Sequence, residues 1–385
     1  MTENLTIISL NNMTFIRDRY HTPQEMVAFL KEGAMIRSFS YMLDELRPGE
    51  DVGRLLTDGL TEITGEKRDS VSKKVRNWRN GRNLPKDRET MFQICFILQL
   101  SEEQADRLIG RLSDTGIHYR NPAELSYAYA LRTGRTYEEA RRLKETALAL
   151  YEQETKKPAA QAPEIFTSWV RKAFYEVDTD EKFESFIRDH SAQLGQMHET
   201  SYRKFKELLK LLQNPEEGYG EAYSLADVMR EYMQMRVPVQ QRGSARSTGA
   251  VKKSDMDVFQ KMVRLYWPNE STLSRMQNRT EDVSRKTLLL LYLATESFDD
   301  STEDEEDFWI YEDVEEDPDI LLETRIEKVN LFLHDCGMNR LDPGNPFDLL
   351  FLYAMKTEQD EEARARMEDV LAVLFKENEE DKEPE

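Results

Sequence analysis

The sequence has only two cysteines, Cys95 and Cys336, which lie far apart in apolar helical contexts. A disulfide framework is therefore not expected, and a reducing compartment is the default. The longest apolar run, Leu288 to Ala294, is far too short to span a membrane, and the first residues lack the basic segment of a signal peptide. These absences predict a cytoplasmic protein with no membrane partner.

Residue patterns that carry chemistry are also scarce. The five histidines form no helix-spaced metal pair, and no CxxC motif is present, so a zinc site is not expected. The candidate phosphate loop at 242–246 lacks the Gly-Lys-Ser/Thr ending and a preceding strand. We therefore predict no catalytic residues, no metal, no cofactor and no enzyme activity.

Glycine and proline are sparse, and alternating valine-rich runs are nearly absent, which argues against strands. Helix starts are clear instead: Thr22 and Asn121 each precede a proline, and Ser101 and Thr136 begin capping boxes. The sequence thus predicts an all-α, multi-helical fold. In its first part we expect helices near 23–31, 35–46, 52–64, 70–80, 87–99, 102–113, 122–133 and 137–154.

Changes in composition along the chain suggest a division into helical blocks separated by linkers. The expected segments are a helix-turn-helix domain at 1–155, a linker at 156–163, a middle domain at 164–236, a flexible linker at 237–253, a third helical domain at 254–378 and an acidic tail at 379–385.

The first and third blocks resemble each other. At a shift of 198 residues, Val75, Trp78 and Asn80 fall on Leu273, Met276 and Asn278, and at a shift of 224 residues Asn121-Pro122-Ala123-Glu124-Leu125 falls on Asn345-Pro346-Phe347-Asp348-Leu349. The change of shift places an acidic segment, 299–319, as an insertion in the second copy. A diverged internal repeat is the prediction, with chance similarity between helical segments as the alternative.

Charge is spread unevenly along a chain whose formal net charge is -21. Residues 299–319 contain thirteen acidic side chains and no basic one, whereas residues 66–90 contain nine Lys/Arg against four Asp/Glu. A basic cluster in an acidic protein is more informative than the global balance, because it marks one local surface for an anionic partner.

That basic cluster has a defined helical pattern. Val71, Val75 and Trp78 lie at helical spacing and predict one buried face, with basic residues on the remaining surface. Asp69 or Ser70 could cap the helix, and Gly81 followed by Pro85 predicts its end.

This segment, with the helix that precedes it and the one that follows at 88–98, resembles the lambda-repressor/Cro-like helix-turn-helix family over about residues 36–100. The resemblance rests on the Val-Arg-Asn-Trp-Arg-Asn-Gly-Arg run at 75–82 and Pro85. It implies that the helix near 70–80 is a recognition helix that enters the major groove of double-stranded DNA. The implied base-facing residues are Ser70, Ser72, Lys73, Lys74 and Asn77, with Arg76 on the same helix, and Arg79, Arg82 and Lys86 would lie near phosphates.

Alternatives stay open for each basic segment. The helix near 70–80 could contact a protein or serve only structure, and the second copy, with Ser271, Arg275 and Arg279, is expected to be a degenerate one used for packing or protein contact. The acidic segment 299–319 could compete with DNA for the surface of residues 73–82, or serve only solubility.

Two functions follow from these patterns. The first is a DNA-binding transcriptional regulator whose later helical regions bind a protein partner or form a homodimer. The second is a non-enzymatic helical adaptor whose helix-turn-helix-like units bind proteins in a regulatory or defence complex.

Overall fold

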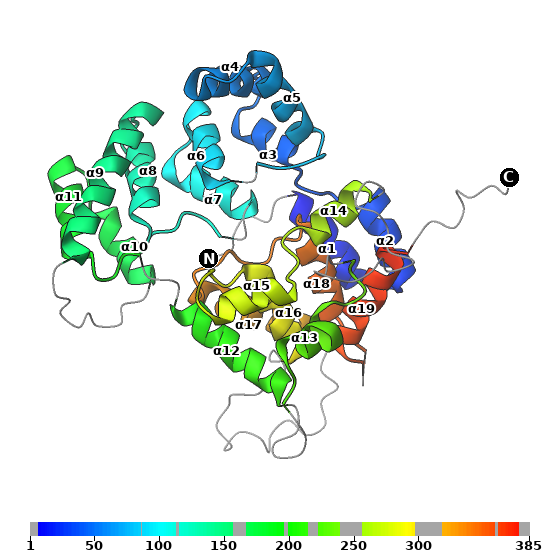
Figure 1. The fold of residues 1–385 in the computed structure, drawn as a ribbon. Coiled ribbons are helices and arrows are strands. Elements are labelled where there is room, and N and C mark those ends of the chain that lie inside the picture. The colour runs from blue at the N-terminus through cyan, green and yellow to red at the C-terminus, as the bar shows by residue number, and fades with distance from the viewer. Residues whose placement is uncertain are drawn as a thin grey trace. The chain divides into compact units, whose positions relative to one another are not determined.

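The computed structural model describes residues 7–85, 87–112, 115–156, 167–195, 199–214, 222–238, 256–296, 318–358 and 361–376, with the backbone alone at 167–169. Within these ranges the chain forms nineteen α-helices, one π-helical turn and no strand (Figure 1). The predicted all-α fold is confirmed. None of the described helices is long and apolar enough to cross a membrane.

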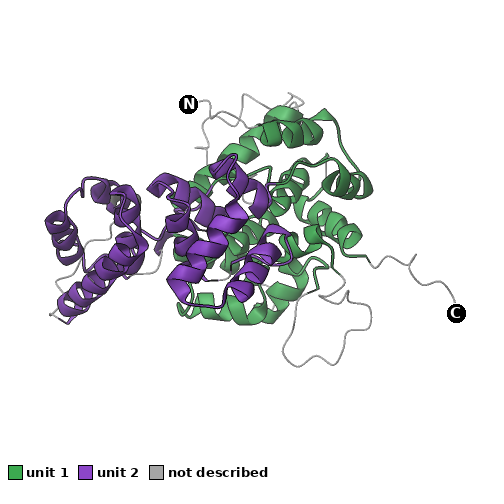
Figure 2. Ribbon diagram, turned by 90° about the horizontal axis from the view of Figure 1, so that it is seen from above, with its two compact units in different colours: residues 1–36, 201–335, 340–385 green, residues 37–200, 336–339 purple. Residues whose placement is uncertain are grey.

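The helices fall into two compact units, coloured separately in Figure 2. Unit 2 comprises Arg37–Thr200 and Cys336–Asn339, and unit 1 comprises Met1–Ile36, Ser201–Asp335 and Arg340–Glu385. The helices of unit 2 are α3 (Phe39–Leu46), α4 (Val52–Thr64), α5 (Arg68–Arg79), α6 (Arg88–Ile97), α7 (Glu102–Leu112), α8 (Pro122–Arg132), α9 (Tyr137–Thr155), α10 (Thr167–Tyr175) and α11 (Asp180–Asp189). Those of unit 1 are α1 (Ile7–Asp18), α2 (Pro23–Glu32), α12 (Glu199–Gln213), α13 (Leu225–Val228) with the π-helical turn Met229–Met233, α14 (Val258–Arg264), α15 (Glu270–Gln277), α16 (Arg285–Ala294), α17 (Pro318–Asp335), α18 (Pro346–Met355) and α19 (Ala363–Leu374).

Capping residues set most helix starts at the predicted positions. Thr22 and Thr136 form capping boxes at the starts of α2 and α9, and the Asn121 side chain accepts hydrogen bonds from the first turn of α8. Each cap satisfies backbone donors that the helix itself leaves unpaired. The starts of α2, α4, α7, α8 and α9 therefore coincide with the expected ones.

Two helices depart from the prediction. α3 begins at Phe39 rather than near residue 35, because the Ser38 side chain caps it. α1 was not expected, since its buried stripe includes polar side chains that obscure the helical pattern. The fully buried Asn12 donates hydrogen bonds of 2.8 Å to the carbonyls of Met35 and Pro343 and accepts one from the amide of Met35.

The two compact units divide the chain differently from the expected domains. Residues 1–36, expected with the helix-turn-helix block, belong to the unit that also holds the C-terminal helices, where α2 packs against α18 and α19. The middle block expected at 164–236 is shared, because α10 and α11 lie in unit 2 and α12 and α13 lie in unit 1. Each unit is defined by packing between residues far apart in the sequence. Changes in composition along the chain cannot reveal such packing.

Both units contain a similar polar network built around a buried carboxylate. In unit 2, Arg88 pairs with Glu124 at the start of α8, and Glu124 also accepts a 2.8 Å hydrogen bond from the amide of His118. In unit 1, Arg285 donates hydrogen bonds of 2.9 and 2.8 Å to Asp348 at the start of α18. The residues that surround each pair also correspond at the shift of 224 residues. The carbonyl of Gly116 accepts from Arg88, as that of Arg340 accepts from Arg285. The amides of His118 and Asp342 donate to the two carboxylates, and Asn121 and Asn345 cap the two helices.

The contacts of two helix pairs also correspond. In unit 2, Arg132 donates to the carbonyl of Phe174 in α10, and the Tyr129 hydroxyl donates to Asp180 at the start of α11. In unit 1 the residues 224 positions later make the matching contacts: Lys356 donates to the carbonyl of Arg17 in α1, and the Tyr353 hydroxyl donates to the carbonyl of His21, just before α2. α1 and α2 thus occupy against α18 the place that α10 and α11 occupy against α8, which supports the proposed repeat.

Candidate nucleic-acid interface

The candidate interface is built on α4 and α5, two helices joined by a tight turn. The Asp51 side chain caps α4, and Gly65 ends it in the left-handed conformation at φ 69°. α5 begins at Arg68, so only residues 65–67 connect the helices. Because no side chain caps α5, the prediction that Asp69 or Ser70 caps it was wrong: the helix starts earlier and carries Asp69 in its first turn, where a negative charge favours the helix dipole.

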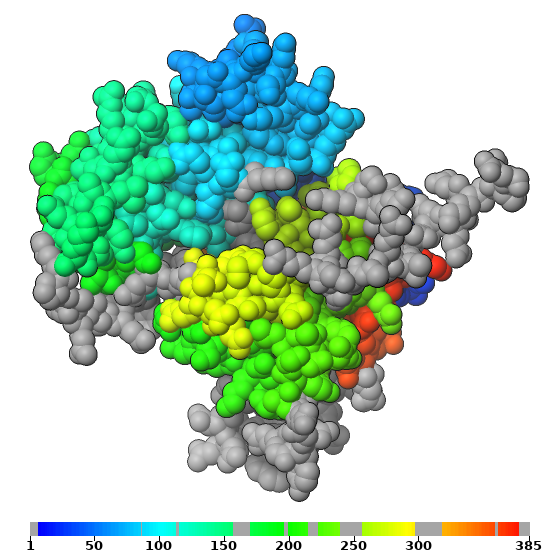
Figure 3. All heavy atoms as spheres, viewed as in Figure 1, coloured from blue at the N-terminus to red at the C-terminus, as the bar shows by residue number. Residues whose placement is uncertain are grey.

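The packing of α5 follows the predicted pattern. Val71, Val75 and Trp78 are buried, and they belong to the hydrophobic core of unit 2. α5 ends at Arg79. Just beyond it, Gly81 adopts the left-handed conformation at φ 65°, and the Arg82 amide donates to the carbonyl of Asn77. This packing leaves the opposite face of α5 on the protein surface, and the side chains of α4 and α5 are visible in blue in Figure 3.

Most of the predicted contact residues lie on that face. Lys86 lies outside the described residues. Asn77 and Arg79 are half-buried, and the exposed members are Ser70, Ser72, Lys73, Lys74, Arg76 and Arg82. Four of the five predicted base-facing side chains, all except the half-buried Asn77, are therefore exposed to a large partner.

Two of the predicted cations are already paired. The Lys74 ammonium lies 2.6 Å from the Glu66 carboxylate, and Arg79 lies 3.2 Å from Asp44. Within the described residues, Lys73, Arg76 and Arg82 take part in no ion pair. Exposed pairs contribute little to stability, so Lys74 and Arg79 can exchange their carboxylates for an incoming anion.

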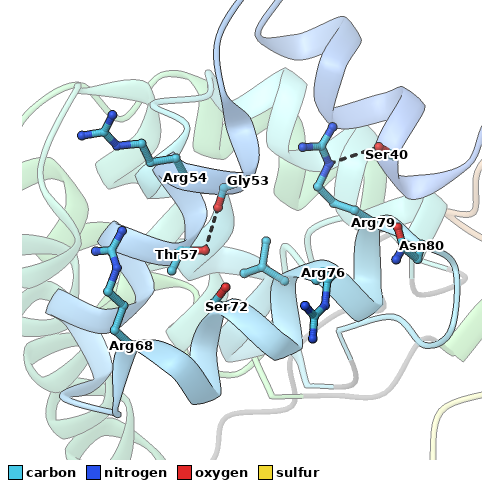
Figure 4. A pocket seen from close by; sticks show the side chains of 10 residues that line it. Ser40, Gly53, Arg54, Thr57, Arg68, Ser72, Arg76, Arg79 and Asn80 are labelled. Atoms are coloured by element: carbon cyan, nitrogen blue, oxygen red, sulfur yellow. Dashed lines mark hydrogen bonds between the residues drawn. The ribbon is translucent and has the colours of Figure 1, made fainter.

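A hollow of about 420 Å³ lies between α4 and α5 (Figure 4). Four arginines line it: Arg54 from α4 and Arg68, Arg76 and Arg79 from α5. Its remaining lining residues are Ser40, Gly53, Thr57, Ser72, Val75 and Asn80.

The hollow depends on Gly53 and on the two carboxylates at its rim. A Cβ atom at Gly53 would lie 3.1 Å from the Arg79 guanidinium, so glycine leaves room for that side chain. Asp58 pairs with Arg54 and Arg68, as Asp44 does with Arg79. With four guanidinium groups and two carboxylates, these side chains give the hollow a net positive charge.

Sequence analysis missed Arg54 and Arg68 as members of this site. Both lie outside the run that resembles a recognition helix. Arg68 is in the first turn of α5, and the packing of α4 on α5 adds Arg54 to the same hollow. Their acidic neighbour Asp58, four residues after Arg54, was the available signal, because this spacing places both side chains on one helix face.

α15, the helix of unit 1 that aligns with α5 in the predicted repeat, offers fewer available cations. Arg275 pairs with Glu281 at 2.5 Å and donates to the Ser271 hydroxyl. The Arg279 guanidinium lies 4.4 Å from the ring centre of Tyr202, in cation–π contact. The basic residues at 242–253 and the acidic insertion up to residue 317 lie outside the described residues.

Comparison with known proteins leaves the site to be interpreted from its own geometry. No family model matches the chain, and neither the curated proteins nor the solved structures contain a significant match. Among the described residues, no cluster of histidine, cysteine and carboxylate side chains could hold a metal ion.

Proposed function

We propose that this protein is a DNA-binding regulator that places the exposed face of α5 in the major groove of double-stranded DNA. The main observation in its favour is that Lys73 and Arg76, on α5, form no ion pair with any described residue. α5 is joined to α4 by a tight turn, and an arginine-lined hollow lies beside it. Lys and Arg neutralise phosphates and release counterions, and the neighbouring Asn77 amide is suited to adenine.

The geometry of the helix pair supports this proposal. α4 and α5 are joined by residues 65–67, and the buried stripe of α5 fixes which of its faces is solvent-exposed. A recognition helix has to be held rigidly by the helix before it, so that its side chains meet base edges in one register. In unit 1 the cations of α15 are engaged by neighbouring side chains, so the proposal assigns DNA contact to unit 2 alone.

The test is binding to a pool of duplex DNA across a salt series. The triple variant Lys73→Ala/Lys74→Ala/Arg76→Ala removes three cations from α5, and Arg141→Ala/Arg142→Ala/Lys156→Ala removes the same charge from exposed positions on or next to α9. Each phosphate contact contributes about 0.9 to the slope of log affinity against log salt. We expect the α5 variant to flatten the slope by up to about 2.7 and the α9 variant to change it little.

A helical adaptor is the second candidate, and the pairing of Lys74 with Glu66 favours it, because a protein partner needs fewer free cations than DNA does. If the intact protein binds no duplex even at low salt, the DNA proposal fails. Cross-linking from a residue placed at position 73 would then capture the protein partner of the same face.

A further inference from the structure

The hollow between α4 and α5 has the composition of an anion site. Arginine presents a planar fork of N–H donors that matches the oxygens of a phosphate, and four arginines from two helices line this one hollow. The Arg54 and Arg68 side chains are 75% and 59% exposed, so a ligand can reach both guanidinium groups.

Three hydrogen-bond donors in the hollow are not engaged by any described residue. Within the described residues, the Arg76 guanidinium, the Ser72 hydroxyl and the Asn80 side-chain amide make no hydrogen bond. Thr57 differs, because its hydroxyl donates to the carbonyl of Gly53 at 2.7 Å (Figure 4). An anion seated beside Arg76 would therefore gain hydrogen bonds without breaking an ion pair of that residue.

The size of the hollow also fits a phosphate-bearing group. At about 420 Å³, the hollow is larger than a single small anion requires. The apolar side chain of Val75 forms part of the lining between the arginines. A phosphate seated there would place its charge among the guanidinium groups.

We propose that this hollow binds a phosphate group, with Arg76 and Ser72 as its first ligands and Arg54, Arg68 and Arg79 as the surrounding charges. The phosphate belongs either to the backbone of double-stranded DNA or to a small phosphorylated molecule. If the phosphate belongs to DNA, the site rests on the proposed function. If it belongs to a small molecule, the site does not depend on that function.

The test measures pyrophosphate binding to the full chain by calorimetry at constant ionic strength, with chloride as the balancing ion. The Arg76→Gln variant replaces the guanidinium group with a shorter, neutral amide, and Arg107→Gln makes the same change at an exposed position of α7. A hydrogen bond to a charged group supports a loss of about tenfold to a hundredfold for Arg76→Gln. Arg107→Gln should bind as the unaltered protein does.

Two outcomes would overturn the proposal: no pyrophosphate binding to the unaltered protein, or equal binding to the protein and to Arg76→Gln. Arg76 is exposed, so its substitution leaves the core intact, and an unchanged melting temperature of the free variant checks this.

The source of the phosphate is decided by competition with a duplex. If duplex DNA displaces pyrophosphate and Arg76→Gln flattens the salt slope of DNA binding by about one, the hollow holds a backbone phosphate. If pyrophosphate binds through Arg76 and no duplex binds at low salt, the hollow serves a small phosphorylated ligand. The phosphate site then stands although the proposed DNA function has failed.

Discussion

Substitution of Leu30 by alanine tests whether α1 and α2 complete unit 1 as α10 and α11 complete unit 2. Leu30 is fully buried on α2, which packs against α18 and α19. Its counterpart in unit 2 is Ile187, which is fully buried on α11, and the two residues lie at the same distance from their capping threonines, Thr22 and Thr179.

The expected loss of stability follows from the size of the deleted side chain. Truncating a fully buried leucine or isoleucine to alanine costs about 2–5 kcal/mol, because transfer energy is lost and a cavity remains. In a unit of this size each kcal/mol lowers the melting temperature by about 2–4 °C, which gives a decrease of roughly 4–20 °C. Local opening of the affected helices should rise roughly thirtyfold or more.

Hydrogen exchange of the backbone amides shows which unit is affected. Leu30→Ala should reduce protection in α18 and α19 and leave α8 and α9 unchanged, although the substitution lies more than 300 residues before α18 in the sequence. Ile187→Ala should give the reverse pattern. Loss of protection in α8 and α9 on substituting Leu30, with α18 and α19 unchanged, would refute the proposed equivalence of the helix pairs.

Three further substitutions test single contacts. Asp348→Ala removes the buried carboxylate partner of Arg285 and should cost about 3–5 kcal/mol, measured by urea unfolding; a loss below about 1 kcal/mol would contradict the role given to this pair. Gly81→Ala should cost about 1 kcal/mol, because φ at this position is 65°, and an unchanged unfolding midpoint would show that α5 ends without it. Hydrogen bonds from Arg19 and from the backbone of Thr22 lower the pKa of Glu25 from 4.5 to about 2, so the stability that Glu25 adds is complete above about pH 4.5 and is lost as the pH falls toward 2. The difference in melting temperature between the protein and Glu25→Gln should shrink over that range; a pH-independent difference would exclude this origin.

Local signals in the sequence predicted most of unit 2. Capping side chains such as Asn121 and Thr136 mark helix starts because they satisfy backbone groups within three residues, so the helix begins where the pattern indicates. The start of α5 at Arg68 differs in this respect. No side chain caps this helix, so no capping signal in the sequence marks its first residue.

The candidate site could be predicted only in part for a related reason. The exposed face of α5 follows from helical periodicity, because Val71, Val75 and Trp78 define the opposite face. The hollow cannot be predicted from this periodicity, because Arg54 lies on α4 and meets Arg76 only when the two helices pack. The pairing of Lys74 with Glu66 is likewise invisible in the spacing, because Glu66 precedes the helix and reaches Lys74 across its first turns.

The difference between the two units has a consequence for folding. The described helices of unit 2 lie in one continuous stretch from α3 to α11, whereas unit 1 joins α1 and α2 to helices that begin near residue 199. Closing a longer loop costs more conformational entropy before any contact repays it. During synthesis, α1 and α2 have no place to dock until α18 and α19 exist, because Tyr353 and Lys356 supply the contacts to His21 and Arg17. Unit 2 can therefore complete its core first, and the α5 surface can form before unit 1 closes.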